Sequence, residues 1–193
     1  MGLREERTFT VEEFHDWHER QEASYELVDG RAVMMTGGTN RHAFAISNIA
    51  AALRPQVRAG CNVTTSDLAV RTGETQLRYP DVIVDCGPVD LDGYDAANPV
   101  VVVEVLSRST EVFDATGKLE EYKRVPSVRV VLHVSPRTVT VDCYCRGDAG
   151  WNHQRFTDLD DVVELPEIHA RLALGDIYEG LNPEPSPHLR VVD

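Results

Sequence analysis

The stretch Val100-Val101-Val102-Val103-Glu104-Val105-Leu106 decides the fold of this 193-residue chain. Five of its seven residues are valine, whose branched side chain suits a strand. A run this apolar predicts a strand that is buried on both faces of a sheet. Glu104 breaks the run, and a buried carboxylate is costly unless it is paired or binds a metal. Glu104 is therefore the first candidate functional residue; the alternatives are a pair with an arginine or a place at the exposed end of the strand.

The segments around this strand predict an α/β core. A buried strand at 82–84 precedes it, and another at 128–134 follows a helix that we expect over 114–123 and that Pro126 ends. The order strand, strand, helix, strand is typical of α/β proteins. Shorter strands are expected at 63–65, 68–71, 77–79, 139–144 and 154–156, with a closing strand or turn at 173–181. We expect one domain over residues 1–181 and a flexible tail over 182–193, which holds three prolines.

The N-terminal part predicts a helix, a hairpin and a second helix. Thr10 and Glu13 have the spacing of a capping box and predict a short helix that runs to about residue 22. Two β-prone runs at 25–28 and 31–34 flank Asp29-Gly30, a pattern typical of a tight hairpin. From residue 41 to about 57 the apolar residues recur at helical spacing, which predicts an amphipathic helix.

The charge of the chain excludes several classes of protein. Its formal net charge of −13 speaks against a basic nucleic-acid coat protein. Residues 147–193 hold ten acids and three bases, whereas residues 108–137 hold four acids and six bases and are net positive. No apolar run is long enough to span a membrane, and the N-terminus lacks the apolar segment of a secretory signal, so we expect a cytoplasmic protein.

The four cysteines have spacings that do not match the usual pairs of a structural zinc site. Cys143 and Cys145 are two residues apart on an expected strand, so both point to one face. We favour free thiols of a cytosolic protein, buried or half-buried, for all four, including Cys61 and Cys86, with a metal site as the alternative.

A second carboxylate precedes the strand at 82–84. Pro80 fixes the entry to that strand and holds Asp81 at a defined point. If this strand and the valine-rich strand are neighbours, Asp81 and Glu104 can converge on one cation, and carboxylate oxygens with waters suit Mg2+ or Mn2+. A plain turn residue is the alternative for Asp81.

Lys118 is one of only two lysines in the chain, and it follows Glu104 by 14 residues, in the expected helix. Its ammonium group can hold a hydroxide or a phosphate oxygen. The alternative is a pair with Asp114 on a solvated helix face. Tyr122 lies one turn further along, on the same side of the helix as Lys118.

One ordered set of motifs spans residues from about 9 to 181: Tyr25-Glu26-Leu27-Val28-Asp29-Gly30, Pro80-Asp81, Val103-Glu104-Val105-Leu106-Ser107-x-Ser109-Thr110, Asp114, Lys118 and Tyr122. Together they resemble the Uma2 family of endonucleases, a domain of unknown function within the PD-(D/E)xK nuclease superfamily. The resemblance implies a restriction-endonuclease-like core, in which helices flank a mixed sheet and an N-terminal helix and hairpin are attached.

For the site, the resemblance implies that Asp81 and Glu104 are catalytic and bind Mg2+ or Mn2+. The superfamily usually places its lysine two residues after the glutamate, where this chain has Leu106, and the family resemblance gives that role to Lys118. Glu26 matches an acidic residue that completes such sites. We expect the substrate to contact three further residues, His42, Arg108 and Tyr122; a plain helix-start residue is the alternative for His42.

The chain departs from the family at two places. Members commonly read Ser-Pro-Ser-Thr where this chain has Ser107-Arg108-Ser109-Thr110, and the strand at 129–136 lacks their aromatic pair and aspartate. Neither change touches Asp81, Glu104 or Lys118. Both bear on contacts with a substrate or a partner.

The expected function is that of a Mg2+-dependent endonuclease that hydrolyses DNA and has no membrane partner. Other enzyme classes are disfavoured, because the chain has no Gly-x-Ser-x-Gly elbow, P-loop or dinucleotide fingerprint. The alternative is a nucleic-acid-binding or regulatory module that keeps the nuclease fold without turnover, which the acidic surface favours. The oligomeric state stays open, although nucleases of the superfamily often form a homodimer to cut two strands.

Overall fold

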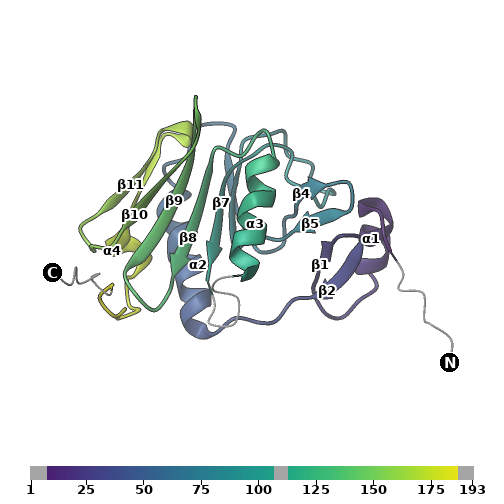
Figure 1. Cartoon of the computed structure of the whole chain (residues 1–193), viewed down its shortest axis with the longest axis horizontal. Helices are drawn as coiled ribbons and strands as arrows, with labels where there is room; N and C mark the ends of the chain where they lie inside the picture. Colours follow the sequence, from purple (N-terminus) through teal and green to yellow (C-terminus); the bar gives the residue numbers. More distant parts are fainter. Residues whose placement is uncertain (1–7, 107–112, 187–193) are drawn as a thin grey trace.

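The centre of the fold is a six-stranded sheet, seen in a computed structural model that describes residues 8–106 and 113–186. The strand order is β10-β9-β8-β7-β6-β3. Strands β7 and β8 run parallel and the other neighbours antiparallel, so the sheet is mixed, as predicted (Figure 1). The bounds are β3 (Asn62–Thr65), β6 (Val82–Asp85), β7 (Pro99–Val105), β8 (Val130–Ser135), β9 (Thr140–Gly147) and β10 (Gly150–Phe156).

Strand β7 is buried along its whole length, as the valine run predicts. Helix α2 (Asn40–Leu53) covers one face of the sheet, where its apolar residues join the larger core. Helix α3 (Phe113–Arg124) covers the other face, where Leu119 and Tyr122 pack in one cluster with Val102. Because side chains alternate along a strand, Glu104 lies on the same face as Val102, toward α3.

A smaller sheet lies beside the first, in the order β2-β1-β5-β4. Its hairpin is the predicted one, and Asp29 and Gly30 both have positive φ angles, as the tight turn requires. Helix α1 packs on this sheet through Phe14, in a cluster that includes Leu27. The bounds are α1 (Val11–His18), β1 (Tyr25–Val28), β2 (Arg31–Met34), β4 (Val70–Gly73) and β5 (Gln76–Arg78).

Two predicted helices end earlier than expected. The capping box of α1 is present, but the helix stops at His18, because the next amides bond three residues back rather than four: Arg20 to Trp17 and Gln21 to His18. Helix α2 stops at Leu53, two residues before Pro55, which has no amide hydrogen to continue it.

The C-terminal region differs most from the prediction. The expected closing strand or turn at 173–181 contains a short helix, α4 (Leu174–Ile177), after an antiparallel pair, β11 (Val162–Leu165) and β12 (Ala170–Ala173), joined by a turn of 3-10 helix at Pro166–Ile168. Backbone hydrogen bonds also reach past residue 181: the amide of Val139 donates to the carbonyl of Glu184, and the amide of Glu184 donates to the carbonyl of Arg137.

The prediction of four free thiols is wrong for one pair. Cys61 and Cys86 form a disulfide, since β3 and β6 run antiparallel and pair Asn62 with Asp85, which brings together cysteines 25 residues apart. Cys143 and Cys145 are free, as predicted, with their sulfur atoms 3.1 Å apart. Among the described residues, no helix has the length and apolar character that crossing a bilayer requires.

Candidate active site

Asp81 and Glu104 meet because their strands are neighbours. Strand β6 pairs antiparallel with β7, with Val82 opposite Val103, so the residue before Val82 lies beside the residue after Val103. The amide of Val105 donates a hydrogen bond of 2.6 Å to Asp81 Oδ2. The strand pairing on which the predicted convergence of the two carboxylates depends is therefore confirmed, and Asp81 is more than a turn residue.

Glu104 is buried under α3, with 8% of the residue exposed. The Tyr122 hydroxyl donates a hydrogen bond of 2.6 Å to Glu104 Oε1, and Lys118 Nζ lies 3.8 Å from the same oxygen. Burial raises the pKa of Glu104 to about 7; the carboxylates of Asp81 and Glu26 act in the same direction, while Lys118 and Tyr122 oppose it. Its partners are thus a lysine and a tyrosine, rather than the arginine or exposed strand end of the alternatives.

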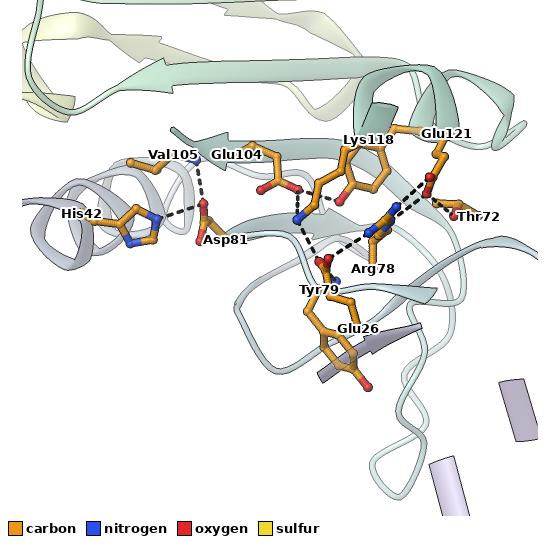
Figure 2. A network of polar contacts seen from close by, with 11 residues as sticks. Glu26, His42, Thr72, Arg78, Tyr79, Asp81, Glu104, Val105, Lys118 and Glu121 are labelled. Carbon is orange, nitrogen blue, oxygen red and sulfur yellow. Dashed lines mark hydrogen bonds and ion pairs between the residues drawn. The ribbon is translucent and has the colours of Figure 1, made fainter. Parts of the chain in front are cut away.

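Lys118 links α3 to the N-terminal hairpin (Figure 2). Its ammonium donates to Glu26 Oε1 at 2.8 Å, and Glu26, on β1, is itself buried. The Lys118 side chain is only 14% exposed, which contradicts the alternative of a solvated helix face. The structure thus brings Glu26, Lys118 and Glu104 together, as the resemblance implies.

Arg78 is a buried member of the site that the sequence analysis missed. Its guanidinium donates to Glu26 Oε2 at 2.9 Å and forms two further hydrogen bonds, of 2.7 and 2.8 Å, with Glu121 on α3. Thr72 also donates to Glu121. A sequence signal existed: Arg78 stands between Leu77 and the Tyr79-Pro80-Asp81 motif, where an arginine in an apolar strand needs a carboxylate.

His42 lies in the first turn of α2, which Thr39 caps. Its Nε2 atom is 3.4 Å from Asp81 Oδ2. The hydrogen bond with Asp81 raises the pKa of His42 above its ordinary value, against the effect of burial. The structure therefore places His42 at the site, in contact with a predicted metal ligand.

For Tyr122 and Arg108, the two other residues expected to contact the substrate, the outcome is different. Tyr122 is completely buried, and its hydroxyl serves Glu104, so this side chain has no surface for a substrate. Arg108 falls within 107–112 and lies outside the described residues.

His133 is a further residue that the sequence analysis did not single out. It lies on β8, directly beside Glu104 in the parallel register, with 6% of the residue exposed. Its Nε2 atom is buried and has no hydrogen-bond partner within the part of the chain that is described. Burial lowers the pKa of His133 to about 4, so the imidazole is neutral at neutral pH.

The donor set fits Mg2+ or Mn2+. Asp81 and Glu104 offer hard carboxylate oxygens, and the charge of Asp81 raises the pKa of Glu104, a repulsion that a shared cation would relieve. Residues 8–106 and 113–186 contain no group of three or more His, Cys, Asp or Glu side chains arranged to hold a metal. A two-carboxylate site completed by water is the arrangement that Mg2+ commonly accepts.

The comparisons with known proteins identify the family and the fold. The profile of the Uma2 family, described as a putative restriction endonuclease, matches residues 11–175. The fold is similar to that of a crystal structure from Anabaena variabilis described as a putative nuclease belonging to DUF820, with a TM-score of 0.71 and 19% identity over 90% of this chain and 99% of that one. An uncharacterized protein of Synechocystis, slr1290, is 35% identical over 88% of this chain and 91% of its own length. The fold is nuclease-like, and the chain belongs to the Uma2 family, as its motifs indicated.

Proposed function

We propose that the protein is a metal-dependent endonuclease that hydrolyses phosphodiester bonds in DNA. The observation that carries the proposal is a buried carboxylate, Glu104, beside Asp81 and within 3.8 Å of the Lys118 ammonium. Two carboxylates and one lysine are the groups that metal-assisted phosphodiester hydrolysis needs at one point.

In this proposal Asp81 and Glu104 hold Mg2+ or Mn2+. The ion lowers the pKa of a bound water and neutralises charge on the phosphoryl group when it is present. Tyr122 orients the Glu104 carboxylate through its hydrogen bond, and the amide of Val105 does the same for Asp81. His42 adds a positive partner for Asp81 when it is protonated.

Lys118 is the proposed catalytic lysine, which orients the attacking water or stabilises charge on the phosphoryl oxygens. Glu26 acts as its positioning residue, since it accepts the Lys118 hydrogen bond at 2.8 Å. Arg78 in turn binds the other carboxylate oxygen, Glu26 Oε2, at 2.9 Å, so Lys118 donates to a carboxylate that a buried ion pair already holds in place.

The test is plasmid cleavage by the purified full chain in Mg2+ and in Mn2+. We expect wild type to nick supercoiled DNA and Asp81→Asn, Glu104→Gln and Lys118→Met to lose the activity. Glu164→Gln is the matched control, because Glu164 is an exposed carboxylate on β11. Linear product formed directly from supercoiled plasmid would indicate paired cuts by a homodimer, and nicked circles would indicate single cuts.

Absence of metal-dependent cleavage of any DNA or RNA by wild type would refute the proposal. Calorimetry distinguishes the endonuclease from the remaining alternative, because a regulatory module without turnover is expected to bind neither Mg2+ nor Mn2+ near neutral pH.

A further inference from the structure

A row of polar side chains crosses the sheet from the candidate active site. In register, Glu104 on β7 lies beside His133 on β8, His133 lies opposite Asp142 on β9, and Asp142 lies opposite Arg155 on β10. Paired residues of neighbouring strands point to the same face, so all four side chains lie on the α3 face. At about 4.8 Å per strand the row is about 14 Å long, the rise of about four stacked nucleotides.

The outer end of this row is open. Figure 1 shows α3 beside β7, with β9 and β10 continuing the sheet away from it. On the α3 face of β10 the side chains of His153 and Arg155 are 46% and 56% exposed. The next two rows across the same face place His153 opposite Tyr144 and Trp151 opposite Arg146.

This open face is built of aromatic rings and cations. The His153 ring stacks on Tyr144, with ring centres 4.6 Å apart and planes 15° from parallel. Lys123 Nζ lies 5.3 Å from the centre of the Tyr144 ring and 6.0 Å from that of Trp151. The Arg146 guanidinium lies 4.7 Å from the Trp151 ring centre. Rings with interleaved cations are the composition of surfaces that bind single-stranded nucleic acid.

The positions of these groups are fixed by other contacts. Arg146 donates to the backbone carbonyls of Lys123, Val125 and Val128, which attaches it to the end of α3. Arg155 makes a two-point contact with Asp142, with hydrogen bonds of 2.8 and 2.9 Å. The surface is thus arranged before any ligand arrives, which lowers the entropy lost on binding.

Charge also favours a polyanion here. The cations of this face are Lys123, Arg146 and Arg155, and the carboxylates paired with them are Asp142 and Glu120. Outside Glu104, these groups sum to one positive charge, in a chain whose net charge is −13.

We propose that the α3 face of β9 and β10 binds a segment of single-stranded nucleic acid and leads it to Glu104. Unpaired bases stack on the exposed side of His153 and on Trp151, and phosphates contact Lys123 and Arg155. Stacking requires that the bases be free, so the partner is an unpaired strand rather than a closed duplex. This inference rests on the proposed function for the direction of the strand, but it concerns binding and not cleavage.

The test measures binding without metal, so that no cleavage occurs. A fluorescein-labelled oligo(dT) is titrated with the full chain in EDTA and followed by anisotropy. We expect the double variant His153→Ala/Lys123→Ala to bind at least tenfold more weakly than wild type. Gln154→Ala is the matched control, because Gln154 is an exposed residue of the same strand that points to the opposite face, and it should bind within twofold of wild type. Circular dichroism confirms that each variant is folded.

Two further arms separate stacking from charge. His153→Phe keeps a flat ring and should bind within threefold of wild type. An abasic oligonucleotide of equal length has the charge without the bases, and His153→Ala should weaken binding of oligo(dT) but not of this probe.

The inference would be overturned if His153→Phe lost as much affinity as His153→Ala. It would also be overturned if wild type failed to bind oligo(dT). The two proposals fail separately. Selective binding without any metal-dependent cleavage refutes the endonuclease and leaves this surface; cleavage and affinity unchanged in the double variant refute the surface and leave the endonuclease.

Discussion

The Lys118 ammonium on α3 donates a 2.8 Å hydrogen bond to Glu26 on β1. This contact joins the N-terminal hairpin to the helix that follows the central strand, 92 residues away in sequence. An ammonium group therefore lies close to Glu104, although the chain itself has the apolar Leu106 two residues after this carboxylate. The lysine reaches that carboxylate from the helix packed over the strand, at 3.8 Å, instead of from the strand itself.

Removal of the Glu26 charge should weaken both the fold and the position of Lys118. Glu26→Gln leaves two buried cations, Lys118 and Arg78, with one carboxylate fewer. Breaking a buried ion pair on one side costs about 3 kcal/mol, so we expect a loss of that size in the free energy of unfolding. Urea denaturation measures it, with Glu164→Gln as the control. Equal unfolding curves for Glu26→Gln and the control would contradict this prediction.

Both the shape and the charge of the Arg78 side chain should contribute to the stability of the fold. Arg78→Lys keeps the charge but cannot make the two-point contact with Glu121 while also reaching Glu26. We expect Arg78→Lys to lose about 2 kcal/mol of stability. Arg78→Met removes the guanidinium from two buried carboxylates and leaves Glu26 with Lys118 and Glu121 with Thr72, so we expect it to lose about 4 kcal/mol. Thermal and urea unfolding test whether stability falls in the order wild type, Arg78→Lys, Arg78→Met. Arg78→Met as stable as Arg78→Lys would show that the ion pairs contribute little.

How far the sequence predicts this site depends on the distance between partners along the chain. Glu104 stands out because its neighbours are valines, and Asp81 joins it through the pairing of consecutive strands, so local patterns suffice for both. The contact of Arg78 with Glu121 joins β5 to α3 and depends on how two separately predictable elements pack. The Cys61–Cys86 disulfide could not be predicted for the same reason, because it depends on how two separate elements come together. Strand β11 carries only four residues and one acidic side chain among them, too short a pattern to separate from a loop.

Glu104 should make the fold less stable at high pH. Its folded-state pKa of about 7 lies above the ordinary 4.5, so its contribution to stability is complete below pH 4.5 and is lost as the pH rises through 7. Glu104→Gln cannot ionise and still accepts the Tyr122 hydrogen bond. Relative to wild type in EDTA, this variant should gain about 2 kcal/mol in the free energy of unfolding between about pH 5 and pH 8. A difference that does not change with pH would contradict the raised pKa of Glu104.

The same pKa predicts how metal binding depends on pH. A carboxyl group must be deprotonated to bind Mg2+, and protons compete with the ion below pH 7. Calorimetric titration should therefore show an affinity that rises about tenfold per pH unit up to pH 7 and then becomes constant. A constant affinity between pH 5 and pH 7 would mean that Glu104 is not a ligand.

His133 should make the fold less stable in acid. Its folded-state pKa of about 4 lies below the ordinary 6.5, so the unfolded chain binds the proton first, and stability that is complete above pH 6.5 is lost as the pH falls toward 4. Glu104 on β7 lies beside it, and the groups that shift its pKa are Asp142 on β9, His153 on β10, and Lys118 and Lys123 on α3; of these four only Asp142 favours the charged form. His133→Leu removes the titration and fills a similar volume. Between about pH 7 and pH 4 wild type should lose about 2 kcal/mol more of its free energy of unfolding than His133→Leu, measured by urea denaturation. Parallel losses in the two proteins would show that acid acts through other groups, and that the imidazole beside Glu104 accepts a proton as easily in the folded chain as in the unfolded one.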